Sequence, residues 1–228
     1  MGNIQLLNID CMEYLVTLPD KAFDLACCDP PYGLGFDGDS TFGNNPSEKW
    51  KNPAKNDKYL IKHWDKEKPN KEYFNELRRI SKKAIIWGGN YFTDVLPPSG
   101  GWIIWNKGVA DGMSLSDAEM AWTNVSNNIK LCKFLWSGFR KCEITERFHP
   151  TQKPVKLYEW LLKNYAKPGQ RIIDTHLGSG SSAIAAHYFG VDFVGCEIDK
   201  DYFEMAKARF ERQTRQMAMF DYEDAPNA

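Results

Sequence analysis

The residues from Arg171 to Glu197 constrain the fold of this chain more than any other part of the sequence. The apolar stretch 171–177 predicts a strand, the glycine-containing stretch 178–183 predicts a loop, and 184–189 predicts a helix. A second apolar stretch, 192–197, predicts another strand and ends in an acid, Glu197. A strand, a tight loop, a helix and a strand in this order form a unit with two parallel strands. We therefore predict an α/β fold.

The loop of this unit has the composition of a nucleotide-binding turn. Its glycines let a ligand approach the backbone, and the N-terminus of the following helix favours a negatively charged group. Glu197 lies nineteen residues after Gly178, close to the spacing of about 20 residues at which an acid reaches ribose hydroxyls. Residues 178–183 also fit the dinucleotide pattern Gly-x-Gly-x-x-Ala. By itself, the loop does not separate a nicotinamide-dependent enzyme from a methyltransferase.

A second group of chemically informative residues, Asp29-Pro30-Pro31-Tyr32, follows the apolar stretch 22–28. That stretch predicts a buried strand, and the two prolines end it because they cannot donate to a sheet. An acid is then held at the carboxyl end of a strand, where open α/β sheets bind ligands. The Asp29 carboxylate and the Pro30 carbonyl can accept the two N–H groups of an exocyclic amine, and Tyr32 can stack on an extruded base. A plain strand end followed by a turn is the alternative.

Together these motifs resemble the S-adenosylmethionine-dependent DNA amino-methyltransferases, which act on N6 of adenine or N4 of cytosine. The resemblance is to the group in which Asp-Pro-Pro-Tyr precedes the glycine loop, and it runs from about Leu7 to Arg209. A third family motif matches His149–Pro154. The resemblance implies a doubly wound α/β domain of the class I methyltransferase type, with a mostly parallel, permuted, seven-stranded sheet. In this order the N-terminal strand, 4–8, is expected beside the strand that ends at Glu197.

The resemblance also implies the residues of the site. The catalytic residues are Asp29, Pro30, Pro31 and Tyr32. The residues implied to bind the cofactor, S-adenosylmethionine, are Asp10, Cys11, Lys153, Asp174, His176, Leu177, Gly178, Ser179, Gly180 and Glu197. The family usually has Asp-Pro-Phe before its glycines, and His176 replaces that Phe with another ring, so cofactor binding is expected to survive. Asp10 has an alternative role as the cap of a helix at 12–18.

Charge is unevenly distributed along a chain whose formal net charge is −1. Residues 49–83 carry ten lysines and two arginines against five acids, and residues 130–156 carry seven basic residues against two acids. Such local basic surfaces fit contact with DNA phosphates. We therefore predict a DNA-facing loop at about 33–65 and a short target-recognition segment at about 125–148, with DNA contacts from Lys49, Lys51, Lys55, Lys58, Arg140 and Lys141. A solvated lysine-rich surface and a simple edge hairpin are the alternatives.

The remaining composition predicts a single domain over 1–228 without a metal. The six cysteines and four histidines are scattered, with no Cys-x-x-Cys or paired-His spacing, so reduced thiols are expected. No apolar run resembles a signal peptide or is long enough to span a bilayer, and the cytoplasm is the expected location. Further helices are expected at 71–81, from Pro154 onward and at 200–213, and further strands at 84–92, 102–107 and 118–123.

The target base and the partners follow from the resemblance and from the C-terminal residues. Asp at the head of the catalytic motif favours N6 of adenine in double-stranded DNA over N4 of cytosine. RNA, a non-catalytic DNA-binding relative and a nicotinamide-dependent enzyme are the alternatives. A homodimer and a place in restriction–modification are typical of the family.

The C-terminal residues carry a second signal. Residues 215–228 are predicted to form a disordered tail. Within it, Gln216-Met217-Ala218-Met219-Phe220 resembles the motif by which bacterial replication and repair proteins bind the sliding clamp. The alternative is that these apolar residues fold back onto their own domain.

Overall fold

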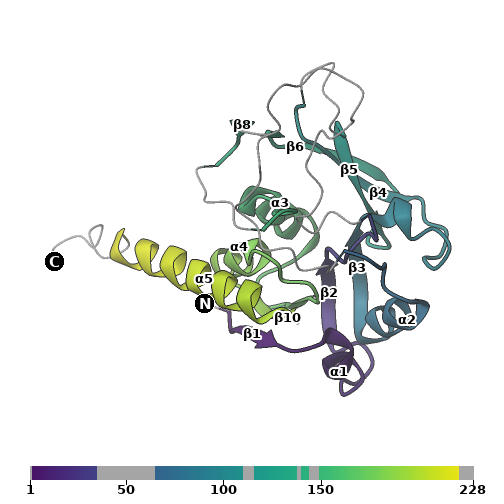
Figure 1. Cartoon of the computed structure of the whole chain (residues 1–228), viewed down its shortest axis with the longest axis horizontal. Coiled ribbons are helices and arrows are strands. Elements are labelled where there is room, and N and C mark those ends of the chain that lie inside the picture. Colours follow the sequence, from purple (N-terminus) through teal and green to yellow (C-terminus); the bar gives the residue numbers. More distant parts are fainter. Residues whose placement is uncertain (1, 35–64, 110–115, 138–139, 144–148, 221–228) are drawn as a thin grey trace.

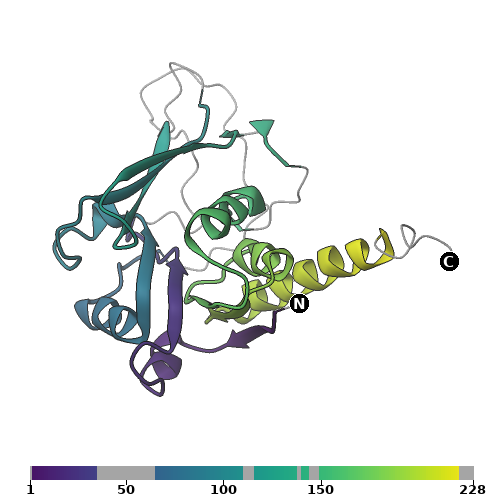
Figure 2. The ribbon, with the colours of Figure 1, turned by 180° about the vertical axis from the view of Figure 1, so that it is seen from behind.

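Helices cover both faces of a central sheet in the structure, a computed structural model that describes residues 2–34, 65–109, 116–137, 140–143 and 149–220 (Figure 1). The helices are α1 (Cys11–Leu15), α2 (Lys71–Ile80), α3 (Val155–Tyr165), α4 (Ser181–Phe189) and α5 (Lys200–Phe220), with a 3-10 helix, η1, at Gly89–Tyr91. α1 and α2 lie on one face of the sheet, and α3, α4 and α5 lie on the other. The view from behind shows the same division (Figure 2).

The main sheet has eight strands in the order β1-β10-β9-β2-β3-β5-β4-β6. Their bounds are β1 (Ile4–Asn8), β2 (Phe23–Cys28), β3 (Ser81–Trp87), β4 (Gly101–Asn106), β5 (Ala118–Thr123), β6 (Ile129–Lys133), β9 (Arg171–Asp174) and β10 (Asp192–Glu197). β5 runs antiparallel to β3 and β4, and the other neighbours are parallel. β7 (Trp136–Ser137) and β8 (Arg140–Lys141) form a separate two-stranded sheet.

The permuted order expected from the sequence is confirmed, because β1 pairs in parallel with β10 and places Asn8 opposite Glu197. The expected number of seven strands is wrong. β6, which comes from the segment 125–148, adds an eighth strand beside β4. Cys132 of β6 is buried, whereas Ile129 and Leu131 are each 67% exposed. Lys130 and Lys133 are exposed as well, so β6 is covered only at Cys132, as fits its position at the edge of the sheet.

The central strands are apolar on both faces because helices cover both. In β2, Leu25 and Cys27 belong to the cluster under α3 and α4, whereas Ala26 and Cys28 belong to the cluster under α1 and α2. α2 begins after Asn70, whose side chain accepts a hydrogen bond from the backbone N–H of Tyr73. The apolar positions of α2 recur at helical spacing and form one buried face, made of Tyr73, Phe74, Leu77 and Ile80.

Several element boundaries differ from the sequence expectations, each for a local reason. The strand expected to reach 92 ends at Trp87, because Gly88 adopts a left-handed φ of 69° and η1 follows. Pro154 stands just before α3 in an extended conformation, rather than inside the first turn.

The end of α5 also corrects an expectation. This helix continues past Gln213 to Phe220, so the tail predicted to be disordered from about 215 is helical to 220. The Arg, Gln, Met and Ala residues at 215–219 are good helix formers, which accounts for the extension. Residues 221–228 lie outside the described residues.

All six cysteines are free in the structure. Burial raises the pKa of Cys28 and of Cys132 to about 12, so both thiols stay protonated at neutral pH. Over the described ranges, no helix combines the length and the apolar character that a membrane span requires.

The packing of α2 can be tested through Phe74, which is fully buried and whose ring centroid lies 5.0 Å from that of Phe92. Phe74→Ala should lower the free energy of unfolding by about 3–5 kcal/mol, because apolar burial is lost and a cavity remains. Ile129→Ala, at an exposed edge position, should change it by less than about 0.5 kcal/mol. Urea unfolding followed by circular dichroism measures both variants. Equally small effects would contradict the packing of α2 against the sheet.

Candidate active site

The Asp-Pro-Pro-Tyr motif begins where β2 ends, next to the strand that leads into the glycine loop. β2 and β9 are neighbours in the sheet. From β2 the chain crosses over to β3 on one side, and from β9 it crosses over to β10 on the other side. In open α/β sheets, ligands bind outside the carboxyl ends of two strands related in this way. The topology therefore brings the two main sequence motifs to the same edge.

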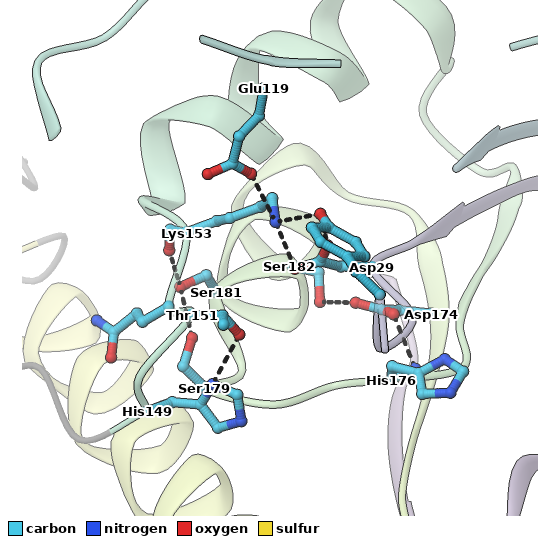
Figure 3. Close-up of polar contacts among 12 residues, drawn as sticks. Asp29, Glu119, His149, Thr151, Lys153, Asp174, His176, Ser179, Ser181 and Ser182 are labelled. Atoms are coloured by element: carbon cyan, nitrogen blue, oxygen red, sulfur yellow. Dashed lines mark hydrogen bonds and ion pairs between the residues drawn. The ribbon is translucent and has the colours of Figure 1, made fainter. Parts of the chain in front are cut away.

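The Asp29 carboxylate is held by two protein donors (Figure 3). The Tyr32 hydroxyl donates a hydrogen bond to Oδ1 over 2.7 Å, and the Lys153 ammonium lies 2.5 Å from Oδ2. The Asp29 side chain is 15% exposed and that of Lys153 is 4% exposed. Because an ionised carboxylate has about four acceptor positions, Asp29 can accept a further donor from a ligand while both contacts persist.

Lys153 links three parts of the site. Its Nζ also lies 3.1 Å from Oε2 of Glu119 on β5, and it stands over the rings of Tyr32 and Trp87, 5.7 and 5.5 Å from their centroids. Its backbone carbonyl accepts a hydrogen bond from the Ser181 hydroxyl at the start of α4. Lys153 was predicted from the resemblance to bind the cofactor. Its ammonium group is directed instead to Asp29 and Glu119, and only its backbone contacts the glycine loop.

The charges of this group are mutually dependent. Burial raises the pKa of the Asp29 carboxyl above its ordinary value, and the Lys153 ammonium and the Tyr32 hydroxyl oppose that rise. Burial disfavours the charge on Lys153, but Asp29 and Glu119 outweigh it and raise the pKa of Lys153. Burial likewise opposes ionisation of Glu119, but Lys153 and Lys107 lower its pKa. Lys153 and Glu119 are therefore both charged at neutral pH.

The Tyr32 ring is fixed by residues that follow β3. It stacks on the Tyr91 ring of η1, with a centroid distance of 5.1 Å and an interplanar angle of 22°. Gly88 passes so close that a Cβ atom built there would lie 2.2 Å from the Tyr32 ring. A glycine is required at this position for two reasons, its left-handed φ and this contact. The sequence signal for this support is the Gly88-Gly89 pair at the end of a predicted strand.

The backbone after the motif is fixed by Asp65, which is 3% exposed. Its Oδ1 accepts the backbone N–H groups of Tyr32 and Gly33, over 2.8 and 3.0 Å, and its Oδ2 accepts that of Leu34 over 3.3 Å. Sequence reasoning counted Asp65 only as one acid among many lysines. Nothing in the spacing identified it as a partner of Tyr32.

The glycine loop before α4 has the backbone geometry that a cofactor loop requires. Gly178 and Gly180 adopt positive φ values of 50° and 76°. Oε2 of Glu197 accepts the backbone N–H of Gly178 over 2.9 Å, and Oε1 accepts that of Asp199 over 3.0 Å. Glu197 thus anchors the loop and keeps acceptor capacity on both oxygens for ribose hydroxyls. Leu177 is buried and donates its backbone N–H to the carbonyl of Cys196.

Asp174 and His176 lie at the start of this loop, and both are expected to be neutral for much of the time at neutral pH. Burial raises the pKa of Asp174 to about 7, and this carboxyl accepts hydrogen bonds from the Ser182 hydroxyl and the His176 backbone N–H. Burial lowers the pKa of His176 to about 4, a shift that the Asp10 carboxylate opposes. The His176 ring packs edge-on against Tyr73. His176 is therefore an uncharged ring, as the substitution for Phe requires.

The other predicted cofactor residues lie around the same loop. Asp10 caps α1 by accepting the N–H of Met12 over 2.8 Å, which confirms the capping alternative without excluding the cofactor role. Burial raises the pKa of the neighbouring Cys11 thiol to about 12. Ser179 is buried against the Ser181 hydroxyl. The third sequence motif packs on the loop through His149, whose ring a Cβ at Gly178 would meet at 3.7 Å.

The predicted DNA contacts are only partly described. Lys49, Lys51, Lys55 and Lys58 lie outside the described residues. Lys141, on β8, stands over the Trp136 ring at 5.5 Å, and the neighbouring Arg140 pairs with Ser137 through its backbone. These assignments stay predictions.

Comparison with known proteins shows what the chain is similar to. The family described as DNA methylase, of the N6/N4 type, matches residues 104–208. The chain is 25% identical over 254 residues to the type II methyltransferase M2.MboI of Moraxella bovis, covering 93% of this chain and 89% of that protein. It is 35% identical over 89 residues to the type II methyltransferase M2.DpnII of Streptococcus pneumoniae, covering 38% and 33%. Over these residues the chain is similar to the N6/N4 DNA methylases.

Solved structures share the class I methyltransferase fold of this chain. The M1.HpyAVI–SAM complex matches with a TM-score of 0.56 and 20% identity, covering 90% of this chain and 99% of that one. The cytosine-N4-specific PvuII DNA methyltransferase matches with a TM-score of 0.60 and 14% identity, covering 92% and 87%. The relatives therefore include an enzyme for cytosine, and the base is left open at this level.

S-adenosylmethionine is the cofactor of this family of methylases, and the residues present fit it. A loop with two glycines at positive φ admits close approach of a ligand, and Glu197 and Asp10 provide carboxylate acceptors for hydroxyl and amino groups. When bound, the cofactor supplies the methyl group. Among the described residues, no group of three or more His, Cys, Asp or Glu side chains is arranged to hold a metal ion.

The support of Tyr32 can be tested with a glycine substitution and a matched control. Gly88→Ala combines a left-handed φ with a clash against the Tyr32 ring, whereas Gly169→Ala has a similar φ of 79° and no atom within 4 Å of the new Cβ. Each should cost about 1–2 kcal/mol of unfolding free energy for the backbone alone. Only Gly88→Ala should also lower turnover in methyl transfer, by at least about tenfold. Equal turnover in the two variants would contradict the role of Gly88.

Proposed function

We propose that this chain is a DNA methylase and that it transfers a methyl group to N6 of adenine, with the target base extruded from double-stranded DNA. The observation that carries the proposal is the oriented Asp29 carboxylate, held by Tyr32 and Lys153 at the edge of the sheet where β9 leads into the glycine loop. An extruded base presents its amino group at such a site, out of the stack in which its neighbours would shield it.

Each residue of the motif has a separate task in this proposal. Asp29 accepts one N–H of the target amino group and compensates the positive charge that develops on that nitrogen. The Pro30 carbonyl accepts the other N–H, and Pro31 stiffens the turn that aims it. Tyr32 packs against the base. Most of the acceleration comes from alignment of the amino nitrogen with the methyl group, because placement alone supplies about 7–11 kcal/mol in favourable cases.

N4 of cytosine is the second candidate, and the fold shared with the cytosine-N4-specific PvuII enzyme favours it. Both amino groups present two N–H donors, so the described contacts of Asp29 suit either base. The Asp at the head of the motif supports adenine through the family resemblance. PCR-amplified genomic DNA, which carries no methylated bases, should yield N6-methyladenine after reaction, measured by mass spectrometry of the nucleosides. N4-methylcytosine alone would assign the second candidate, and product only on RNA would contradict a DNA target.

The remaining assignments are proposals that follow from a DNA substrate. The basic residues at 49–58 and at 140–141 would contact phosphates, and a cytoplasmic location would place the enzyme with DNA. A homodimer and a sliding-clamp contact through Gln216–Phe220 are further proposals. The backbone of that segment is helical in the structure.

Asp29→Ala should abolish methyl transfer because the target amino group loses its acceptor. Cofactor binding should stay within about tenfold of wild type, a difference of about 1.4 kcal/mol, since Asp29 is assigned to the base and not to the cofactor. Asp94→Ala, which removes a surface carboxylate that is 59% exposed and paired with Lys68, is the control and should keep wild-type turnover. Tritium transfer and calorimetry measure the two properties. If Asp29→Ala kept its turnover, the role assigned to Asp29 would be wrong.

A further inference from the structure

Three charged residues stand behind Asp29 in a line that the proposed reaction does not account for. The Lys153 ammonium lies between Oδ2 of Asp29, at 2.5 Å, and Oε2 of Glu119, at 3.1 Å (Figure 3). Glu119 in turn lies 3.3 Å from the ammonium of Lys107 through its other oxygen. The order along the line is acid, base, acid, base, with an Asp at the end that faces the substrate.

This arrangement solves a conflict between two requirements on Asp29. A buried carboxylate needs a positive partner to remain ionised, and Lys153 provides it. The same positive charge would oppose the cation that develops on the target nitrogen. A second carboxylate, that of Glu119, lies behind Lys153 and cancels part of that opposition. Lys107 lies at the far end of the line and stabilises the negative charge of Glu119, whose side chain is 27% exposed.

We propose that Lys153 and Glu119 are positioning residues that jointly set the ionisation and the available negative charge of Asp29. Lys153 holds Asp29 as a carboxylate, and Glu119 moderates the charge of Lys153. The inference rests on the proposed role of Asp29 in accepting the target amino group. It assigns a function to Glu119, which no sequence motif identified. It also reassigns the Lys153 side chain from cofactor binding to the support of Asp29.

The direction of the effect follows from the charges that face Asp29. They belong to the motif itself, to β2, β5, β9 and α3, and to the segment that leads into α3. The residues are Tyr32, Cys27, Glu119, Asp174, Tyr158 and Lys153. Lys153 is the one cation in that set of described residues. Lys153→Met therefore raises the pKa of Asp29, and Glu119→Gln lowers it because a nearby negative charge disappears. The first shift should be larger, because Lys153 contacts Asp29 directly, whereas Glu119 is farther away and partly exposed.

The test measures the titration of Asp29 in two ways in wild type, Lys153→Met and Glu119→Gln. ¹³C NMR of aspartate carboxyl groups follows it without DNA, and Asp29→Asn assigns the signal. The single-turnover rate of methyl transfer to PCR-amplified genomic DNA, measured across pH, follows it through activity, because only ionised Asp29 accepts the amino group. The acid limb of the rate profile should move to higher pH in Lys153→Met and to lower pH in Glu119→Gln.

Two exposed ion pairs supply matched controls. Lys82→Met removes a lysine that is 58% exposed and paired with Asp24, and Glu211→Gln removes a glutamate that is 44% exposed and paired with Arg215. Neither should move the Asp29 titration. If Lys153 or Glu119 had a purely structural role, its substitution would lower stability, and Asp29 would titrate at the same pH as in wild type.

Opposite shifts in the two variants support the proposal. Shifts in the same direction, or none, overturn it. Glu119→Gln preserves side-chain size, so it can decide the matter alone if Lys153→Met does not fold. An unchanged or raised pKa of Asp29 in Glu119→Gln would contradict the inference. Failure of wild type to methylate DNA, with the opposite NMR shifts present, would instead overturn the proposed function and leave the charge relation between Asp29, Lys153 and Glu119 standing.

Discussion

The buried ammonium of Lys153 is the interaction on which the site depends most. Its side chain contacts Asp29, 124 residues away in sequence, while its carbonyl contacts Ser181 at the start of α4. One residue therefore fixes the acceptor motif relative to the glycine loop. A charge buried to this degree is tolerated only with partners in place, and loss of one partner leaves an uncompensated charge. The two halves of the site are thus coupled by electrostatics as well as by the sheet.

The permuted sheet imposes a second coupling. β1 closes the cofactor side of the sheet beside β10, and the Asn8 side chain donates to the carbonyl of Glu197, 189 residues later. The cofactor region therefore needs residues from both ends of the described chain, whereas the Asp29 motif needs β2, β3 and β5. Contacts over such sequence separations slow folding relative to local ones. In return, the Asp29 motif and the glycine loop lie at a single edge of the sheet.

The sequence was sufficient to predict the helices, strands and motifs, but not the side chains that contact the motif residues. The strand before Asp29 and the unit from Arg171 to Glu197 were readable because hydrophobic periodicity and glycines are local signals. Asp65 could not be assigned, since its partners lie more than thirty residues away and its neighbours are lysines. Glu119 left a weak signal, an acid in an otherwise mostly apolar strand. Only the fold shows that the Lys153 side chain points to Asp29.

The hydrogen bonds of Asp65 also bear on how such an enzyme could be re-engineered. Residues 32–34 and residue 65 are joined at one carboxylate, so the intervening stretch begins and ends at the same place. A change of sequence between these two points would leave Asp65 and the three residues that it binds unaltered. A variant of this chain can therefore be designed around one carboxylate that must be kept.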